Sequence, residues 1–395
     1  MSANSLASSA TLEAELSFLL AACSEIPRQE KTDRLRQLSR EPVRWKLLFD
    51  LADRHGTRPL LYQALVDIED AVPAAEMSAL EQSYQTNLHK ALFLSRDLIR
   101  IVDRLAALGI EVMPYKGLAL AEVAYGDIAL RQSGDIDLLI HPQDLPRICD
   151  AVRELGYTPH LNLSPAEEHA YLKSGYECAF DGAAGPNLLE VQWAIQPRFY
   201  AIDFDMDGLF RRAGTVTVAG YAMKTPSPED LLLILSAHAA KHVWGRLVWL
   251  CDIARIMSFP TLDWSWIESQ ARTLGVVRIV RVSMLLANRL LDAAIPPAAQ
   301  ASLGEKTATI RIVDALVDEI QSRIASEASF NVESLAYFRL MMRLRERSAD
   351  RLRFLQRLVF TPGPGEWQAV RLPAALFPLY RLVRLSRLAA RLVRT

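Results

Sequence analysis

The stretch Gly134-Asp135-Ile136-Asp137-Leu138-Leu139-Ile140 alternates carboxylate and aliphatic side chains before it becomes wholly aliphatic. A period of two is typical of a strand with one buried face, so the sequence predicts a strand here. Ile136, Leu138 and Ile140 would face a hydrophobic core. Asp135 and Asp137 would then project from the opposite face, ~7 Å apart along the strand.

Two carboxylates on one face of a strand repel each other unless a cation lies between them. Mg²⁺ suits such a pair, because it takes one or two protein carboxylates and fills its other positions with water and phosphate oxygens. Asp135 and Asp137 are therefore candidate Mg²⁺ ligands for phosphoryl or nucleotidyl transfer. The alternative is a solvated strand edge that binds no ligand.

The segment ahead of this strand predicts a phosphate-binding junction. Residues 110–115 have the pattern of a short strand, residues 118–125 that of a helix ended by Gly126, and Lys116-Gly117 joins them. Glycine lets the backbone approach a ligand, N–H groups at a helix start attract anions, and lysine adds a point charge. The alternative is an ordinary connecting turn with a surface lysine.

The loop of residues 127–134 carries two further candidates. Arg131 and Ser133 could each reach a phosphate oxygen, or Arg131 could instead pair with a nearby carboxylate and hold the loop. Gly134 would allow tight backbone geometry directly before the first aspartate.

A third carboxylate is expected on a neighbouring strand. Residues 176–181 and 188–194 flank a turn-rich connection, as in a β-hairpin. In the second of these strands Glu190 alternates with Leu189 and Val191, so it would face away from the core and toward the paired aspartates. Glu190 is a candidate metal ligand or general base, and otherwise a solvated strand residue.

The helical region that follows offers basic candidates. Ser227-Pro228 has the composition of a helix start, and His238 and His242, four residues apart, would share one face of that helix. With Lys241 and Arg246, they are candidates to line the cleft and contact the triphosphate or the acceptor. A zinc pair has no obvious third ligand, and a polar seam between helices is the other alternative.

Together these motifs resemble the polymerase-β-type nucleotidyltransferase superfamily and, within it, a large bacterial family of poorly characterised nucleotidyltransferases. The resemblance covers roughly residues 45 to 260. It rests on Lys116-Gly117, Arg131, Gly134-Asp135-Ile136-Asp137-Leu138-Leu139, Leu189-Glu190-Val191-Gln192-Trp193, Ser227-Pro228-Glu229-Asp230-Leu231-Leu232, His238-Ala239-Ala240-Lys241-His242, Trp249 and Asp252-Ile253-Ala254.

The resemblance implies a small mixed sheet, two aspartates that hold Mg²⁺ beside a third carboxylate, and attack of an acceptor on the α-phosphate of a nucleoside triphosphate. The chain departs from the superfamily at two positions. Lys116-Gly117 stands where these enzymes usually carry Gly-Ser, which leaves the mode of triphosphate binding open. Gln192 stands where relatives often carry His, which puts proton transfer at that position in doubt.

Length and composition limit the remaining interpretations. The chain has 395 residues, half of them hydrophobic, and a net charge of −1, so it has ample material for cores and no global basic field for nucleic acid. The N-terminus lacks the pattern of a signal peptide, and no apolar run is long enough to span a membrane. We therefore expect a cytoplasmic protein, with peripheral contact to the inner membrane surface as one option.

The C-terminal part has an unusual charge. Residues 339–395 contain thirteen Arg, no Lys and three acidic residues, a net charge of +10, so the rest of the chain carries −11. Over residues 379–394, arginine recurs every three or four positions among Leu and Val, which predicts a basic amphipathic helix. This helix could contact an acidic face of its own protein, an anionic membrane surface or a partner protein.

The predicted fold class is α+β, a small mixed-sheet nucleotidyltransferase core flanked by helical segments. The predicted segments are a helical part (1–108), the core (109–226), a second helical part (227–358), and a linker with the basic tail (359–395).

The predicted function is transfer of a nucleoside monophosphate, AMP by default, from a nucleoside triphosphate to a hydroxyl or amine of an unidentified small molecule, peptide or protein. Two Mg²⁺ ions would assist. One alternative is a non-catalytic adaptor that keeps this fold and binds a partner protein or membrane surface. A glycosyltransferase is disfavoured, because about a hundred helical residues precede the Asp-x-Asp motif.

Overall fold

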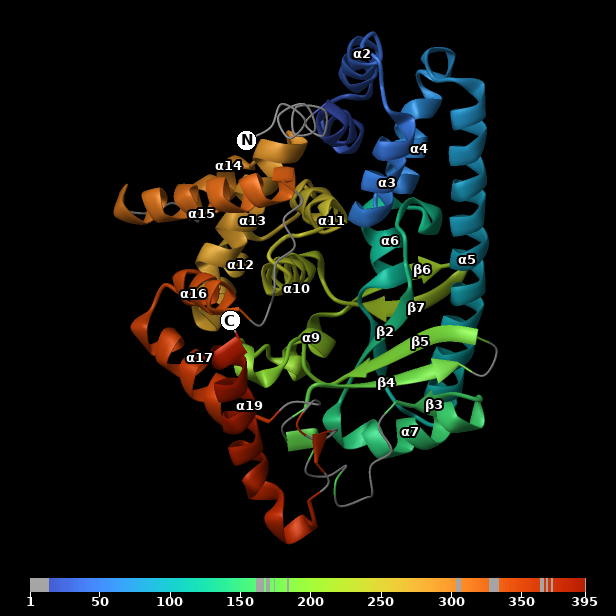
Figure 1. Cartoon of the computed structure of the whole chain (residues 1–395). Coiled ribbons are helices and arrows are strands. Elements are labelled where there is room, and N and C mark those ends of the chain that lie inside the picture. The colour runs from blue at the N-terminus through green and yellow to red at the C-terminus, as the bar shows by residue number, and fades with distance from the viewer. Residues whose placement is uncertain are drawn as a thin grey trace.

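The computed structural model describes residues 14–160, 167, 171–173, 175–182, 185–302, 307–326, 334–362, 366, 369–370 and 372–394. These residues form a helix-rich molecule around a small mixed sheet (Figure 1). Residues 1–13, and residues 363–365 in the predicted linker, lie outside the described residues.

The N-terminal part is helical, as predicted. Residues 14–23 form a helix, followed by α2 (Arg28–Leu38), α3 (Trp45–His55), α4 (Arg58–Val66), η1 (Glu69–Ala71) and α5 (Ala74–Ala107). Pro27 and Pro73 directly precede α2 and α5, and Pro59 lies in the first turn of α4, where its missing N–H costs no helical hydrogen bond. Helix α5 runs along one edge of the molecule (Figure 1).

The central sheet has five strands in the order β1-β2-β5-β4-β3. Strands β2 and β5 pair in parallel and the other pairs are antiparallel, so the predicted mixed sheet is confirmed. The elements of this region are β1 (Val112–Pro114), α6 (Gly117–Tyr125), η2 (Ile128–Leu130), β2 (Asp135–Ile140), η3 (Pro142–Asp144), α7 (Leu145–Glu154), β3 (Thr158–Pro159), β4 (Glu177–Gly182) and β5 (Gly185–Gln192). Strand β5 begins three residues earlier than predicted, so the β4–β5 connection is shorter.

The two faces of the sheet have the polarity that the sequence predicts. Ile136, Leu138 and Ile140 are buried in a core with Leu189 and Val191, against the second half of α5 and against α7. The opposite face carries the acidic side chains of β2 and β5. The alternation of side chains along each strand therefore separates the core from the candidate site.

Helices dominate the rest of the chain. After η4 (Arg198–Tyr200), α9 (Met206–Arg212) and the hairpin of β6 (Gly214–Val218) and β7 (Tyr221–Thr225) come α10 (Pro228–Lys241), α11 (Leu247–Met257), α12 (Trp264–Leu274), α13 (Val277–Leu291), α14 (Pro297–Ser302), α15 (Thr307–Ser326), α16 (Leu335–Arg343), α17 (Ser348–Phe360), η5 (Ala374–Leu379) and α19 (Tyr380–Arg394). The predicted start of α10 is confirmed, since the Ser227 side chain accepts a hydrogen bond from the Asp230 N–H.

The hydrophobic cores cross the predicted segment boundaries. One core joins the N-terminal helices to helices α10–α17, and a second joins α5 to the sheet and includes Tyr380 of α19. The four predicted segments thus share their cores, and their boundaries stay predictions.

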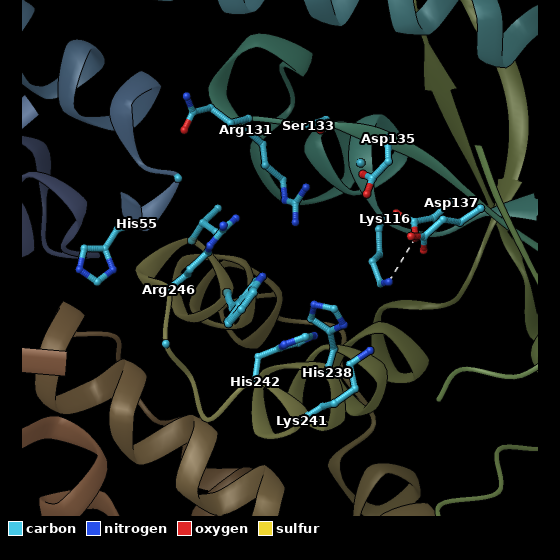
Figure 2. Close-up of a pocket in the computed structure, with 18 of the residues that line it drawn as sticks. His55, Lys116, Arg131, Ser133, Asp135, Asp137, His238, Lys241, His242 and Arg246 are labelled. Carbon is cyan, nitrogen blue, oxygen red and sulfur yellow. Dashed lines mark hydrogen bonds and ion pairs between the residues drawn. The ribbon is translucent and has the colours of Figure 1, made fainter. Parts of the chain in front are cut away.

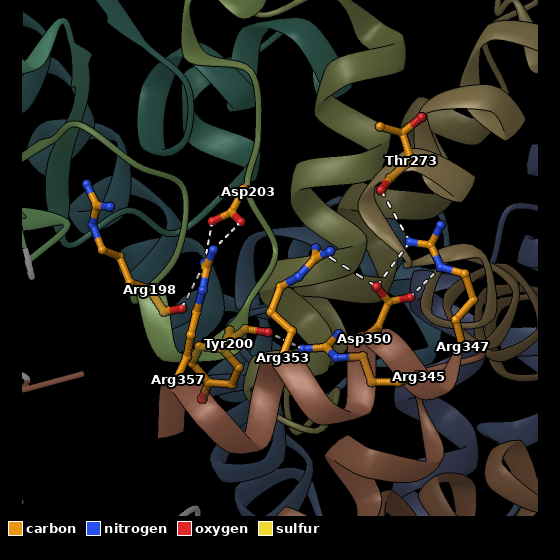
Figure 3. A network of polar contacts seen from close by, with 9 residues as sticks. All are labelled: Arg198, Tyr200, Asp203, Thr273, Arg345, Arg347, Asp350, Arg353 and Arg357. Atoms are coloured by element: carbon orange, nitrogen blue, oxygen red, sulfur yellow. Dashed lines mark hydrogen bonds and ion pairs between the residues drawn. The ribbon is translucent and has the colours of Figure 1, made fainter. Parts of the chain in front are cut away.

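Much of the arginine-rich C-terminal part is paired with acidic side chains of the same chain. Arg357 Nη1 lies 2.6 Å from Asp203 Oδ1 and Arg347 Nε lies 2.6 Å from Asp350 Oδ2 (Figure 3). In α19, Arg384 and Arg387 pair with the buried Glu366 at 3.4 and 3.3 Å. The tail helix therefore contacts its own protein, as one of the predicted alternatives has it. In the described part of the chain, no helix is both long and apolar enough to cross a membrane.

Candidate active site

A pocket of about 950 Å³ lies between the acidic face of the sheet, the α10–α11 region and the α3–α4 turn. All ten residues that the sequence predicts for the site line it (Figure 2). They are Lys116, Gly117, Arg131, Ser133, Asp135, Asp137, Glu190, His238, Lys241 and His242. The structure therefore brings the candidates together, while their roles stay predictions.

The three carboxylates meet because β2 and β5 are parallel neighbours. In their register Asp137 stands opposite Glu190, and Asp135 lies two residues earlier on the same face of β2. The Gln192 amide donates from Nε2 to Asp137 Oδ1 at 3.2 Å and to Glu190 Oε2 at 2.7 Å. Tyr115 donates its hydroxyl hydrogen to Gln192 Oε1 at 2.5 Å, which fixes the orientation of the amide. Gln192 thus positions two of the three carboxylates.

Burial and neighbouring carboxylates together raise the pKa values of two of these acids. Burial, and then the Asp137 carboxylate, raise the pKa of Asp135. Burial, Asp137 and the nearby Glu177 together raise the pKa of Glu190 to about 8. The Lys116 ammonium lies 3.2 Å from Asp137 Oδ1. Burial alone would lower the pKa of Lys116, but the neighbouring Asp137 and Tyr115 outweigh it and raise the pKa.

This donor set suits a Mg²⁺ ion that is shared with a nucleotide. Among the described residues, no group of three or more His, Cys, Asp or Glu side chains converges closely enough to hold a metal by itself. Mg²⁺ does not need such a cage, because one or two carboxylates and the phosphate oxygens of a substrate satisfy it. The raised pKa values of Asp135 and Glu190 mark the charge that such a cation would neutralise.

The junction beside the carboxylates has the features of an anion site. Gly117, the first residue of α6, has φ +53°, and a Cβ there would lie 3.2 Å from the Asp135 carbonyl oxygen. The Ser133 hydroxyl, which lies near Gly117, is buried without a hydrogen-bond partner. At Gly134, by contrast, φ is not positive and a Cβ would meet nothing within 4 Å, so the structure does not use the tight backbone geometry that this glycine would allow.

Arg131 makes the alternative contact that the sequence analysis left open. Its guanidinium donates from Nε and Nη2 to the carboxylate of the fully buried Asp252, at 3.0 to 3.1 Å. The Tyr125 hydroxyl donates to the same carboxylate at 2.9 Å. Arg131 still lines the pocket, but this pair also joins the loop before β2 to helix α11.

The wall opposite the carboxylates is basic and aromatic (Figure 2). The ring centroids of His238, His242 and Trp249 lie 4.9 to 5.4 Å apart. Burial, Lys241 and Lys116 lower the pKa of His242 to about 3, and burial with Lys116 lowers that of His238 as well. Both imidazoles are therefore neutral at pH 7. Burial and Lys116 also lower the pKa of Lys241.

Sequence reasoning missed two parts of the site. The first is Glu177, which lines the pocket next to Tyr176 and stands opposite Gln192 in the β4–β5 register. The register of the predicted hairpin would have placed Glu177 on the acidic face. The second part is the turn of residues 53–56, which forms the far end of the pocket. No local pattern links this turn to strands about eighty residues later.

Comparisons with known proteins identify the family of this chain. The sequence matches the family described as "uncharacterised nucleotidyltransferase" over residues 41–292. The chain belongs to that family, and by class it is a nucleotidyltransferase. A comparison with curated proteins gives no match.

Two solved structures show similarity to this chain. One is a lincosamide antibiotic adenylyltransferase bound to lincomycin, with 14% identity over 41% of this chain and 96% of that one, at a TM-score of 0.30. The other is the antibiotic-resistance factor ANT(2'')-Ia, with 15% identity over 60% of this chain and 95% of that one, at a TM-score of 0.27.

Proposed function

We propose that this protein transfers a nucleoside monophosphate from a Mg²⁺-bound nucleoside triphosphate, ATP by default, to a hydroxyl or amine of a small molecule, peptide or protein. The observation that carries the proposal is the unpartnered, buried Ser133 hydroxyl near Gly117 at the start of α6, in the same pocket as three carboxylates. A buried hydroxyl without a partner costs free energy unless a ligand completes it. A helix start favours a phosphate as that ligand.

Each residue has a role in this proposal. Asp135 and Asp137 would hold Mg²⁺, with Glu190 as the third carboxylate for a second ion or as the base that takes the acceptor's proton. Lys116, the Gly117 N–H and Ser133 would bind the triphosphate, with Arg131 held beside them by Asp252. His238, Lys241 and His242 would approach it from the opposite wall. The bound metal would supply charge neutralisation and polarise the α-phosphate.

Glu190 has the chemistry of a general base once its charge is compensated. Burial, Asp137 and Glu177 raise its pKa above that of an ordinary glutamate, and a bound cation would offset this rise and keep the carboxyl deprotonated. The Gln192 amide holds its carboxylate in place. Because the Gln192 side chain cannot itself carry a proton to or from the acceptor, Glu190 is the better candidate for that step.

The first test is calorimetric titration of the full chain with ATP, GTP, CTP and UTP in the presence of Mg²⁺. We expect Mg²⁺-dependent binding of at least one nucleotide, and its loss in the Asp135→Asn/Asp137→Asn variant. Ser133→Ala should weaken binding about tenfold, because one hydrogen bond to a charged group is removed.

Asp150→Asn is the matched control, because Asp150 lies on the surface of α7 with 77% of its side chain exposed. It should bind as the wild type does, and circular dichroism should show every variant folded. If the wild type binds none of the four nucleotides at millimolar concentration, the catalytic proposal fails and the adaptor alternative is favoured.

A further inference from the structure

The exposed side of helix α19 carries a row of leucines, although the helix is rich in arginine. Leu376, Leu379, Leu382 and Leu385, at every third position of η5 and α19, are all exposed, and Leu382 is 59% exposed. We call these four residues the leucine row. They continue onto the neighbouring helix α17, where Leu352, Leu355 and Phe360 are also exposed.

The opposite face of α19 is fixed to the protein by arginine. Arg384 is buried, stands over the Phe199 ring and donates to the Leu358 carbonyl oxygen at 3.0 Å. Arg387 and Arg384 share Glu366, as described above. Tyr380 is buried in the core of the sheet. The helix is thus oriented so that Arg384 and Tyr380 point inward and the leucine row faces solvent.

The exposed charges of α17 and α19 themselves are of one sign, although the half-exposed Asp203 pairs with Arg357 of α17. Within the described part of residues 334–394, Asp350 and Glu366 are buried, Glu346 is half-buried, and no acidic side chain is exposed. Arg353 and Arg381 are exposed on α17 and α19. Arg353 lies 4.0 Å from Asp350, and Arg381 directly precedes Leu382, so the surface combines exposed aliphatic side chains with exposed arginines.

We propose that the leucine row and its flanking arginines form a docking surface for an anionic phospholipid membrane. A helix of this kind lies in the interface with its apolar face among the acyl chains, while arginines contact the phosphate headgroups. The inward ion pairs hold α19 in place, so the leucine row is presented without refolding. Helices α17 and α19 lie at the periphery of the molecule, where a flat surface can reach them (Figure 1).

Two other occupants fit the observations less well. A second copy of the chain would bring arginines against arginines in a symmetric interface, which like-charge repulsion disfavours. A protein partner is usually anchored by Trp, Tyr or Arg in a central pocket, whereas the row itself consists of leucines alone.

The test is co-sedimentation of the full-length protein with vesicles of phosphatidylcholine, alone or with about one third phosphatidylglycerol. We expect binding only to the anionic vesicles, and weaker binding when the salt concentration is raised from about 0.1 M to about 0.5 M. Leu382→Asp/Leu385→Asp should reduce binding about tenfold or more, since both leucines would enter the interface. Arg381→Glu should reduce it by removing a headgroup contact.

Leu92→Asp/Phe93→Asp is the matched control, because both residues are similarly exposed on α5, away from α19. It should bind vesicles as the wild type does, and nucleotide binding should be unchanged in all three variants. Failure to bind anionic vesicles overturns the proposal and leaves an acidic protein surface as the occupant. A wild-type dimer that Leu382→Asp/Leu385→Asp dissociates overturns it in favour of a second copy. Equal vesicle binding by the row variant and the wild type also overturns it.

Discussion

Asp137 is the residue on which the site converges, and its environment explains how an acidic cluster is tolerated inside a protein. Its carboxylate is only 4% exposed, yet it accepts hydrogen bonds from Lys116 and Gln192. Burying an unpaired charge is costly, whereas a charge with an ammonium and an amide donor is compensated. The same carboxylate then raises the pKa values of Asp135 and Glu190. The charge of Asp137 is thus compensated by its hydrogen-bond donors, whereas Asp135 and Glu190 lie beside a negative charge.

His55 should make the protein acid-sensitive. Burial, with help from Arg54 and Arg246, lowers its pKa to about 4, from 6.5 in the unfolded chain. As the pH falls below 6.5, the unfolded chain therefore binds a proton at this histidine before the folded protein does. The contribution of His55 to the free energy of unfolding is complete above pH 6.5 and falls as the pH drops toward 4. His55 alone should cost about 2 kcal/mol between pH 7 and pH 5.

Urea denaturation at pH 7 and pH 5 measures this loss. His55→Asn keeps an acceptor for the Leu247 N–H, which His55 Nδ1 accepts at 3.3 Å, but cannot titrate. It should lose about 2 kcal/mol less than the wild type over this pH range. Equal losses in the two proteins would show that His55 does not titrate as described.

At the residue scale, the sequence predicts a side chain well when local alternation decides where it points. Asp135, Asp137 and Glu190 follow from such alternation, and the pocket contains all three. His55 could not be predicted, because its burial depends on packing against Leu247, almost two hundred residues later. Its lowered pKa is therefore a property of the tertiary structure alone.

At the element scale, the start of α6 depends on Gly117 and not on Gly134, the glycine directly before β2. Gly117→Ala places a side chain at φ +53° and a Cβ 3.2 Å from a carbonyl oxygen. We expect a loss of about 1–3 kcal/mol of unfolding free energy, together with weaker nucleotide binding. Thermal unfolding and the calorimetric titration measure the two effects.

Gly134→Ala is the matched control, since a Cβ there meets no atom within 4 Å and φ is not positive. It should change stability by less than about 0.5 kcal/mol. If the two variants behave alike, the close approach of α6 to β2 is not what requires Gly117.

The element boundaries were predictable where a chemical signal marks them. Ser227 caps α10 and Gly126, in the left-handed conformation, ends α6, both as predicted. The start of β5 was placed too late, because Gly185-Pro186-Asn187 has the composition of a turn yet forms part of the strand. In this segment the pairing with β4 outweighs local propensity.

At the scale of the whole molecule, the Arg131–Asp252 pair joins the core to the C-terminal helices. Asp252→Ala leaves the Arg131 guanidinium buried without its counter-charge, which should cost about 3–5 kcal/mol of unfolding free energy. The double variant Arg131→Met/Asp252→Leu removes both charges and should recover part of that loss. Chemical denaturation of the three proteins measures the difference. An Asp252→Ala variant as stable as the wild type would contradict this account.

The arrangement of the whole molecule was the least predictable level. The class of fold follows from the Asp-x-Asp strand and its surroundings, and the family match agrees with it. The core that the N-terminal and C-terminal helices share does not follow from the sequence. The pattern of an amphipathic helix shows its apolar face but not the element that packs against it. For the same reason the turn of residues 53–56 could not be placed at the pocket.

The parallel pairing of β2 with β5 has a consequence for biosynthesis. Asp137 and Glu190 become neighbours only when two strands more than fifty residues apart pair, and the rest of the lining adds residues up to Ile324. Such non-local contacts form late, since loop closure comes before any gain from pairing. On the ribosome the nascent chain therefore has no complete pocket until residue 324 has emerged. From that moment a nucleotide that binds only the folded state can favour folding by mass action, and the substrate then assists the maturation of its own enzyme.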